Sequence, residues 1–423
     1  MIALLIIAIF IIGYIAIAFE HPLKLNKAAS ALITGVLCWT IYISQSQNPQ
    51  QVGDELLHHL GEIASILFFL LGAMTIVELI DSHNGFDIIT QNINTTSKKR
   101  FLITVSIITF FLSALLDNLT TAIVMASLCS KILTKKEDKL WFCGMIIIAA
   151  NAGGAWSPLG DVTTTMLWIG GQLTALNIMK HLVLPSMAVC IIPSLLIAKR
   201  FKHQQLNAVL TSNLTQKEKR DGKIIMFAGI GFLIFVPVFK TITHLPPFMG
   251  MLFALGLMWI ITTIIHKSKE PEIAEKFTVA RALQKIDSPS ILFFLGILLA
   301  VSALQSFGLL KQMASILNGT FKNDYLIGIA LGLLSSVVDN VPLVAASQGM
   351  YDLSTYPTDH NFWEFLALTT GTGGSAIIIG SAAGVAVMGI EKIDFIWYIK
   401  KISWLALIGF AAGILVYLLQ MQF

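Results

Sequence analysis

Apolar runs long enough to cross a lipid bilayer recur along the whole chain. A helix that spans hydrocarbon about 30 Å thick needs roughly 20 mostly apolar residues. Only 12% of the residues are charged and 56% are hydrophobic, which is far from the composition of soluble globular domains. The sequence therefore predicts an all-α polytopic membrane protein, with spans near residues 2–19, 28–44, 60–80, 178–198, 224–239, 247–265, 288–310 and 402–419.

Two further apolar runs, 101–133 and 325–353, each carry an Asp-Asn pair near the middle, within SALLDN and SSVVDN. As a single helix, residues 101–133 would extend about 50 Å, which is too long for one crossing and too short for two crossings with a turn. We therefore expect two re-entrant helical hairpins, which turn at Asp117-Asn118 and at Asp339-Asn340.

The distribution of positive charge predicts the orientation. If both runs are re-entrant, every Lys and Arg except Lys180, Lys240, Lys311 and Lys322 lies on one side of the membrane. Cytoplasmic loops are enriched in Lys and Arg, so this side is expected to be the cytoplasm and both termini to lie outside it. The basic loops are residues 20–27, 81–100, 131–139, 199–223, 266–287 and 390–401. This distribution leaves no Lys or Arg embedded in the membrane.

The two halves of the chain resemble each other. ASILFFLLG matches PSILFFLGI, SALLDN matches SSVVDN, and NAGGAWSPLG matches GTGGSAIIIG, in the same order. Because the charge distribution gives matching segments opposite orientations, we expect an inverted-topology repeat of the kind found in secondary transporters. Its halves would be separated by a basic cytoplasmic linker, residues 199–223.

A glycine-rich apolar span follows each hairpin, at residues 141–171 and 361–389. Glycine pairs and Pro158 do not sustain a continuous helix, so we expect two broken transmembrane helices. Unwound backbone at membrane depth normally lines a protein-enclosed site. Close packing through small residues is the alternative explanation, and it accounts for the second span almost as well.

Three carboxylates are predicted at membrane depth: Asp117, Asp161 and Asp339. Each costs roughly 2.5–3.5 kcal/mol at a helix centre, so such groups usually face a cavity or a partner. With no embedded Lys or Arg, the partner would be a cation or a proton. Hard monovalent cations prefer oxygen ligands, and two sets of neighbouring residues supply them. The predicted ion- and proton-binding residues are Asp117, Asn118, Asn151, Asp161, Thr163, Thr164, Asp339 and Asn340, supported by Ser113, Thr120, Thr121, Gly153, Gly154, Ser335, Thr372, Gly373, Gly374 and Ser375.

Other interpretations of these polar residues remain open. Each Asp-Asn pair is also a good helix N-cap, and Asp161 is also suited to hydrogen-bonding exposed amides at the helix break. A carboxylate that binds either a proton or a cation, and faces each side in turn, would perform antiport. We expect no cofactor, no transition metal and no nucleic-acid partner, since Cys38, Cys129, Cys143 and Cys190 lack metal-ligand spacing.

The motifs SALLDNLTTAIVM, NAGGAWSPLGDVTT and SSVVDN resemble those of the NhaD-type sodium/proton antiporters, in the ArsB/NhaD branch of the ion transporter superfamily. The resemblance extends from about residue 60 to 390 and implies Na⁺, Li⁺ and H⁺ as substrates. It also implies a homodimer in a bacterial inner (cell) membrane and an elevator mechanism. The scaffold would comprise residues 1–100 and 224–323, and the transport domain residues 101–198 and 324–423. The second repeat departs from the pattern, because Gly380-Ser381-Ala382 stands where Gly160-Asp161-Val162 stands in the first.

Three alternatives to antiport remain. A related carrier could move a carboxylate anion or arsenite, although aspartates at the hairpin tips would repel a dianion. An intramembrane aspartyl protease would use two aspartates, but only Pro158-Leu159-Gly160-Asp161 partly resembles its motif, so we do not expect an enzyme. A channel would need a continuous pore. We interpret Glu62, Glu78, Asp81, His83 and Glu364 as interfacial, and His58 and His59, near Asp54 and Glu55, as residues of a solvated loop.

Overall fold

The computed structural model describes residues 2–44, 46–86, 95–202, 204–206, 215–267, 275 and 277–422. Regular structure in these ranges is helical, apart from one isolated β-bridge between Ser97 and Gln205. Eight of the described helices are long and apolar enough to cross a membrane. The chain is therefore an all-α, multi-pass membrane protein, as predicted. Residues 203 and 207–214 of the predicted linker, and 87–94 and 268–274 of two basic loops, lie outside the described ranges.

The first half of the chain contains the helices α1 (Ile2–Ala18), α2 (Glu20–Leu23), α3 (Lys27–Ser44), α4 (Pro49–Ser82), α6 (Lys98–Leu116), α7 (Asn118–Ile132), α8 (Lys136–Gly154), α9 (Val162–Ile169) and α10 (Ala175–Arg200). The second half contains α11 (Gln216–Thr243), α12 (Pro247–His266), α14 (Val279–Lys285), α15 (Ser288–Ser306), α16 (Leu309–Phe321), α17 (Asp324–Leu334), α18 (Asn340–Met350), α19 (Asn361–Gly373), η1 (Ile378–Gly380), α20 (Ala382–Glu391), α21 (Phe395–Tyr398), the π-helical η2 (Ile399–Ser403) and α22 (Trp404–Gln420).

The helix breaks fall where the sequence predicts them. α6 ends at Leu116 and α7 begins at Asn118, so that Asp117 alone separates the arms of the first hairpin. α17 and α18 are separated by residues 335–339, which end in Asp339. The glycine-rich spans are interrupted between α8 and α9 and between α19 and α20. Whether the hairpins re-enter the membrane from opposite sides remains a prediction.

One predicted loop is a helix. α4 begins at Pro49, because Asn48 accepts a hydrogen bond from the Gln51 amide and proline is favourable in the first helical turn. The segment that contains His58 and His59 is therefore helical, and our interpretation of a solvated loop was wrong. His59 lies 3.1 Å from the hydroxyl oxygen of Ser306.

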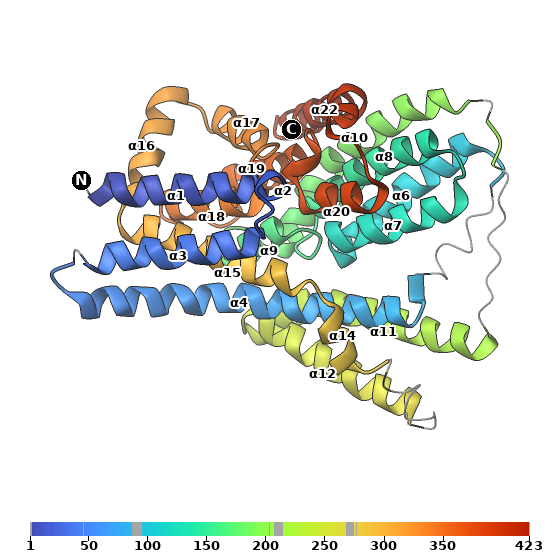
Figure 1. The fold of residues 1–423 in the computed structure, drawn as a ribbon, viewed down its shortest axis with the longest axis horizontal. Coiled ribbons are helices and arrows are strands. Elements are labelled where there is room, and N and C mark those ends of the chain that lie inside the picture. Colours follow the sequence, from blue (N-terminus) through green and yellow to red (C-terminus); the bar gives the residue numbers. More distant parts are fainter. Residues whose placement is uncertain are drawn as a thin grey trace.

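The helices pack in two groups (Figure 1). In one, α3 packs against α1 and α15, while α4 contacts α12 and α15. Gly296 lets α3 and α15 approach closely, since a Cβ there would lie 2.4 Å from the carbonyl carbon of Ala31. In the other group, α6, α7 and α10 pack on α8, α17 packs on α19, and α22 packs on α10. α9, α16 and α18 contact helices of both groups.

The two halves repeat the same packing between hairpin and broken helix. Ser113 donates to the Ala150 carbonyl at 2.6 Å, and Ser335 donates to the Thr370 carbonyl at 2.8 Å. A Cβ on Gly153 would lie 2.2 Å from the Phe110 carbonyl oxygen, while one on Gly373 would lie 2.0 Å from that of Gly332. Small residues at these crossings allow backbone to approach backbone, as in other membrane helix pairs. The packing therefore supports the sequence repeat.

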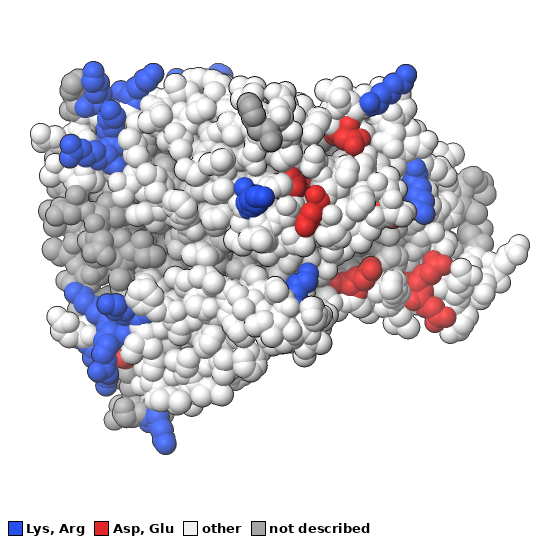
Figure 2. All heavy atoms as spheres, turned by 180° about the vertical axis from the view of Figure 1, so that it is seen from behind, with Lys and Arg blue, Asp and Glu red and all other residues white. Residues whose placement is uncertain are grey.

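Positive charge is unevenly distributed over the surface. Figure 2 shows Lys and Arg side chains gathered at one end of this face, the end where α11 begins in Figure 1, while Asp and Glu lie towards the other end. Most of the Lys and Arg side chains visible on this face thus lie at one end of the molecule.

Candidate functional site

Asp161 lies at the centre of a buried polar network. It precedes α9 as the N-cap and is 2% exposed. Its Oδ1 accepts hydrogen bonds from the backbone amide and hydroxyl of Thr163, at 2.9 and 3.0 Å. The capping function that we considered as an alternative is therefore present, but it accounts for only part of the contacts of this carboxylate.

Amides from both hairpin turns reach Asp161. Asn118, at the start of α7, donates from Nδ2 to Oδ2 at 2.8 Å, and Asn340, at the start of α18, donates to the same oxygen at 3.2 Å. Both asparagines are buried. The two Asp-Asn motifs, far apart in the chain, therefore meet at one carboxylate.

Asn151 connects the network to the second broken span. Its Oδ1 accepts from Asn118 at 3.1 Å, and its Nδ2 donates to the hydroxyl oxygens of Ser375 and Ser381, both at 2.9 Å. Ser381 is the N-cap of α20 and accepts from the Gly384 amide. Ser381 was absent from our predicted site, although the repeat alignment already placed it opposite Asp161.

Asp117 and Asp339 lie outside this network. Asp117 accepts from the amide and hydroxyl of Thr120, at 2.7 and 2.9 Å, and Asp339 accepts from the Val341 amide at 3.1 Å. Both carboxylates are half-buried and cap the second arm of their hairpins. Asp117 has a φ of 111°, which is unusual for a residue other than glycine. Such strain often marks a functional position.

The remaining predicted residues occupy two kinds of position. Thr164 lies beside the break, but its hydroxyl donates to backbone carbonyls, the nearest being that of Ser157 at 2.7 Å. Ser113, Ser335 and Thr372 likewise bond carbonyls, and Gly153, Gly154, Gly373 and Gly374 provide close packing. The hydroxyl of Thr121 is different, because it is fully buried and has no hydrogen-bond partner among the described residues.

Two adjoining cavities lead towards Asp339. The first, about 60 Å³, is lined by Tyr14, Glu20, Lys27, Asp339 and Ser381. The second, about 350 Å³, shares Glu20 and Lys27 and adds Leu119 and Asp287. Lys27 is the first residue of α3, and its ammonium lies 4.7 Å from the centre of the Phe293 ring. The sequence assigned Lys27 to the loop 20–27, and the structure places it at the end of that loop, where it lines both cavities.

The polar groups of the network are carboxylate, hydroxyl and amide groups. In the described part of the chain, no group of three or more His, Cys, Asp and Glu residues comes together in a way that could hold a metal ion. Cys38, Cys129, Cys143 and Cys190 are buried and unpaired.

Glu364 and His83, which we interpreted as interfacial, are both buried within the protein. Glu364 is completely buried, and His83 is 4% exposed, with its Nε2 2.8 Å from that of His266. The pairing of His83 with His266 was not evident from the sequence, because the two residues lie 183 positions apart.

Comparison with known proteins shows the family. A family model described as a citrate transporter matches residues 7–373. The sodium/proton antiporter 1 of Arabidopsis thaliana is 47% identical over 97% of this chain and 71% of its own length, and sodium/proton antiporter 2 is 44% identical over 97% and 98%. The Na(+)/H(+) antiporter NhaD of Vibrio cholerae is 32% identical over 97% of this chain and 90% of its own length.

Proposed function

Since the chain belongs to the NhaD-type sodium/proton antiporters, within the family whose model is described as a citrate transporter, we propose that it exchanges Na⁺ for H⁺ at Asp161. One observation carries the choice of residue. Asp161 is the one described carboxylate to which both hairpin turns donate hydrogen bonds. A carboxylate at membrane depth is expected to need a cation or a proton as its partner.

Rotation of the two amides would switch the site between its occupants. Asn118 and Asn340 present Nδ2 to Asp161, which suits a carboxylate without a bound cation. A sodium ion needs oxygen ligands. Turning each amide over places Oδ1 where Nδ2 lies, because the two ends of an asparagine amide have nearly the same shape. The cation-bound site would then contain Asp161, two amide oxygens and neighbouring hydroxyls such as that of Thr163.

Asp117 and Asp339 would deliver ions rather than bind them at the centre. Asp339 faces a cavity that also contains Glu20, and an adjoining cavity contains Asp287. These carboxylates attract cations, whereas Lys27 in the same cavities opposes them, so that the balance of charge would regulate access. The free hydroxyl of Thr121, in the same hairpin as Asp117, would contribute a ligand along the path.

The division of the helices into two groups supports alternating access. We assign the scaffold to residues 1–100 and 224–323 and the moving transport domain to 101–198 and 324–423, joined by the linker 199–223. The protein would work as a homodimer, with its basic loops in the cytoplasm. An oxygen-lined site of this kind would also accept Li⁺, which is a hard monovalent cation like Na⁺.

The relatives do not all point to the same cellular membrane. The relatives named NhaD are bacterial, while the most similar ones reported above are from a plant. The bacterial inner membrane that we expected therefore remains a prediction.

Proton flux in proteoliposomes tests the proposal. Vesicles with an acidic interior and a trapped pH dye receive Na⁺, Li⁺ or K⁺ outside. We expect Na⁺ and Li⁺ to make the interior more alkaline, K⁺ to have no effect, and Asp161→Asn to abolish the response. Asp54→Asn is a matched control, because Asp54 is exposed on α4. A normal response from Asp161→Asn would disprove the assignment of the site.

Radiolabelled citrate, added to the same vesicles, tests the family description. Uptake of citrate in the absence of any sodium-driven pH change would favour the anion carrier over the antiporter. We expect no uptake, because aspartates at both hairpin turns disfavour a multivalent anion.

A further inference from the structure

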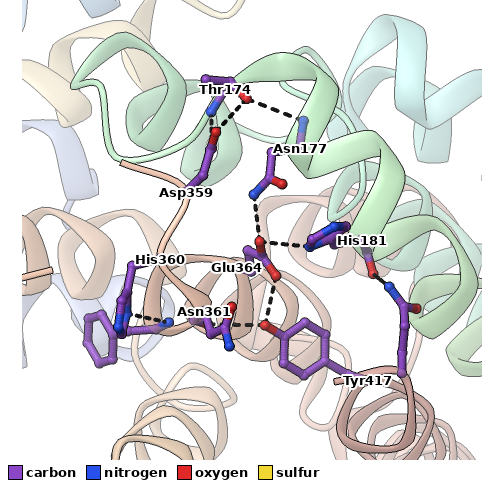
Figure 3. Close-up of polar contacts among 10 residues, drawn as sticks. Thr174, Asn177, His181, Asp359, His360, Asn361, Glu364 and Tyr417 are labelled. Carbon is purple, nitrogen blue, oxygen red and sulfur yellow. Dashed lines mark hydrogen bonds and ion pairs between the residues drawn. The ribbon is translucent and has the colours of Figure 1, made fainter. Parts of the chain in front are cut away.

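Glu364 forms a second buried polar cluster, separate from Asp161 (Figure 3). It lies in the first turn of α19 and is completely buried. Its Oε1 accepts from Asn177 Nδ2 at 2.5 Å and lies 2.9 Å from His181 Nδ1, while the Tyr417 hydroxyl donates to Oε2 at 2.8 Å. Three helices, α10, α19 and α22, therefore meet at this carboxylate.

His181 is the one partner of Glu364 among these contacts that can carry a positive charge. A buried carboxylate needs a charged partner or several hydrogen bonds to offset the loss of hydration. Histidine is the side chain that ordinarily changes its charge between pH 5 and pH 8. The His181 side chain is 25% exposed while that of Glu364 is 1% exposed, so the imidazole lies at the edge of the cluster and the carboxylate lies inside it.

The contacts of the cluster are compatible with two protonation states of His181. With neutral His181, the Glu364 carboxylate accepts hydrogen bonds from three uncharged donors. With protonated His181, the 2.9 Å contact between its Nδ1 and Glu364 Oε1 becomes a salt bridge. A positive charge on the imidazole adds Coulomb attraction to this hydrogen bond, so the protonated state ties α10 to α19 more tightly.

Other titratable groups near the cluster are already engaged or lie further away. Asp359 accepts from the amide and hydroxyl of Thr174, and His360 Nδ1 accepts from the Phe362 amide. On α17, Asp324 accepts from Tyr356, and the ring of Tyr325 packs on Phe365. Lys180 on α10 is exposed. α9 and α18 contain no titratable residue, and the charged residues of α8 lie in its first turn, at the end away from the Asn151 network.

We propose that His181 and Glu364 form a second proton-binding site, which takes up one proton at the imidazole and closes a salt bridge between α10 and α19. Glu364 and Thr372 are eight residues apart on α19, about 12 Å along the helix, and Ser375, which accepts from Asn151, follows shortly after. Proton uptake at the end of α19 would thereby set the pH range of exchange at Asp161. This last consequence rests on the proposed function, whereas the proton site does not.

A double-mutant cycle in thermal stability tests the proton site without any transport assay. The melting temperature of the purified full chain is measured at about pH 5.5 and about pH 8.5, on either side of ordinary histidine titration, for the wild type, His181→Gln, Glu364→Gln and the double variant. The salt bridge can form only while the imidazole is protonated. Its stabilisation is therefore present at low pH and is lost as the pH rises. We expect the interaction between positions 181 and 364 to be at least about twofold larger at the lower pH.

Equal interaction at both pH values would overturn the proton site. Tyr417→Phe is the matched control, because it removes a neutral donor to the same carboxylate and should change stability equally at both pH values. If Glu364→Gln does not fold, His181→Gln alone remains decisive, since its ring is at the edge of the cluster. Its loss of stability must then be larger at low pH.

The effect on exchange is measured separately. In proteoliposomes, His181→Gln should shift the pH of half-maximal sodium-driven flux while leaving the KM for Na⁺ at the optimum within about twofold, as expected for a group that does not touch the ion. An unchanged pH profile, together with a positive stability cycle, would refute the coupling and keep the proton site.

Discussion

The two broken spans share a framework and differ in their polar content. Each is held to its hairpin by a serine hydroxyl on a carbonyl and by a glycine that lets backbone meet backbone. At equivalent N-caps, however, the first span has Asp161 and the second has Ser381. The asparagines of both hairpins turn to Asp161, and Ser381 receives Asn151 instead. The packing between hairpin and broken span is thus present in both halves, whereas only the first span has a carboxylate at its N-cap.

This difference suggests how one site can serve two repeats. Two buried carboxylates close together would repel each other and one would have to be protonated. A single carboxylate surrounded by neutral donors from both halves avoids this cost, and it lets both hairpins respond to the same occupant.

Exchanging the two caps should produce the largest effect. Asp161→Ser is expected to reduce sodium-driven proton flux more than about 100-fold, since each lost hydrogen bond to a charged group is worth roughly 1.5–3 kcal/mol. Adding Ser381→Asp should not restore it, because Gly371 and Ala383 stand where the first repeat has Asn151 and Thr163. Flux in proteoliposomes measures both. Recovery to within about tenfold of the wild type would show that the halves are interchangeable.

Removing the charge from either hairpin turn should give the next largest loss of sodium-driven exchange. Asp117→Asn and Asp339→Asn are each expected to reduce exchange strongly but less than Asp161→Ser does, while membrane insertion and melting temperature stay near those of the wild type. Asparagine caps a helix about as well as aspartate, so the turns should persist. Normal flux in both variants would exclude these carboxylates from the ion path, and loss in only one would show that the path is confined to one half.

Glycines at the two crossings should be equally intolerant of a methyl group. Gly153→Ala and Gly373→Ala each place a carbon about 2 Å from a backbone oxygen. We expect a loss of about 1–3 kcal/mol in stability, or no folded protein. Gly231→Ala is the control, since open space surrounds that position. Melting temperature and monodisperse yield are the readouts. A large difference between Gly153→Ala and Gly373→Ala would contradict a shared framework.

Serine hydroxyls at the same crossings should give the smallest effect. Ser113→Ala and Ser335→Ala remove one interhelical hydrogen bond each, worth about 0.6 kcal/mol on average in membranes. Small and equal shifts in melting temperature are expected for both. If Ser113→Ala alone abolished exchange, the hydroxyl would have to bind the ion rather than support the hairpin.

Much of the site was predictable because the polar residues stand out in apolar sequence. A carboxylate or an amide in an apolar run such as SALLDN or SSVVDN needs a hydrogen-bond partner or a bound cation. Because the Asp-Asn pair occurs in both halves of the chain, the two pairs were expected to meet at one site. Asn118, Asn151, Asp161, Thr163 and Asn340 do meet there. The extension of α4 was missed because its first turns are polar, and capping by Asn48 rather than hydropathy decides where it begins.

Contacts between distant helices could not be predicted in the same way. Glu364 and His181 are 183 residues apart, and nothing in either segment indicates the other. Lys27 was assigned to a loop on the basis of charge, yet the packing of α3 against α15 brings it into the cavity that contains Asp339. Periodicity and composition report on what a segment buries, not on which segment it faces.

The sequence by itself determined the membrane class, the helix breaks and the residues of the repeat, because lipid allows few backbone structures and few uncompensated charges. Tertiary structure alone decided that both hairpins turn to Asp161, that Asp117 and Asp339 stand apart from it, and that Glu364 pairs with His181. Those outcomes depend on hydrogen bonds a few ångströms long between helices, and only packing sets such distances.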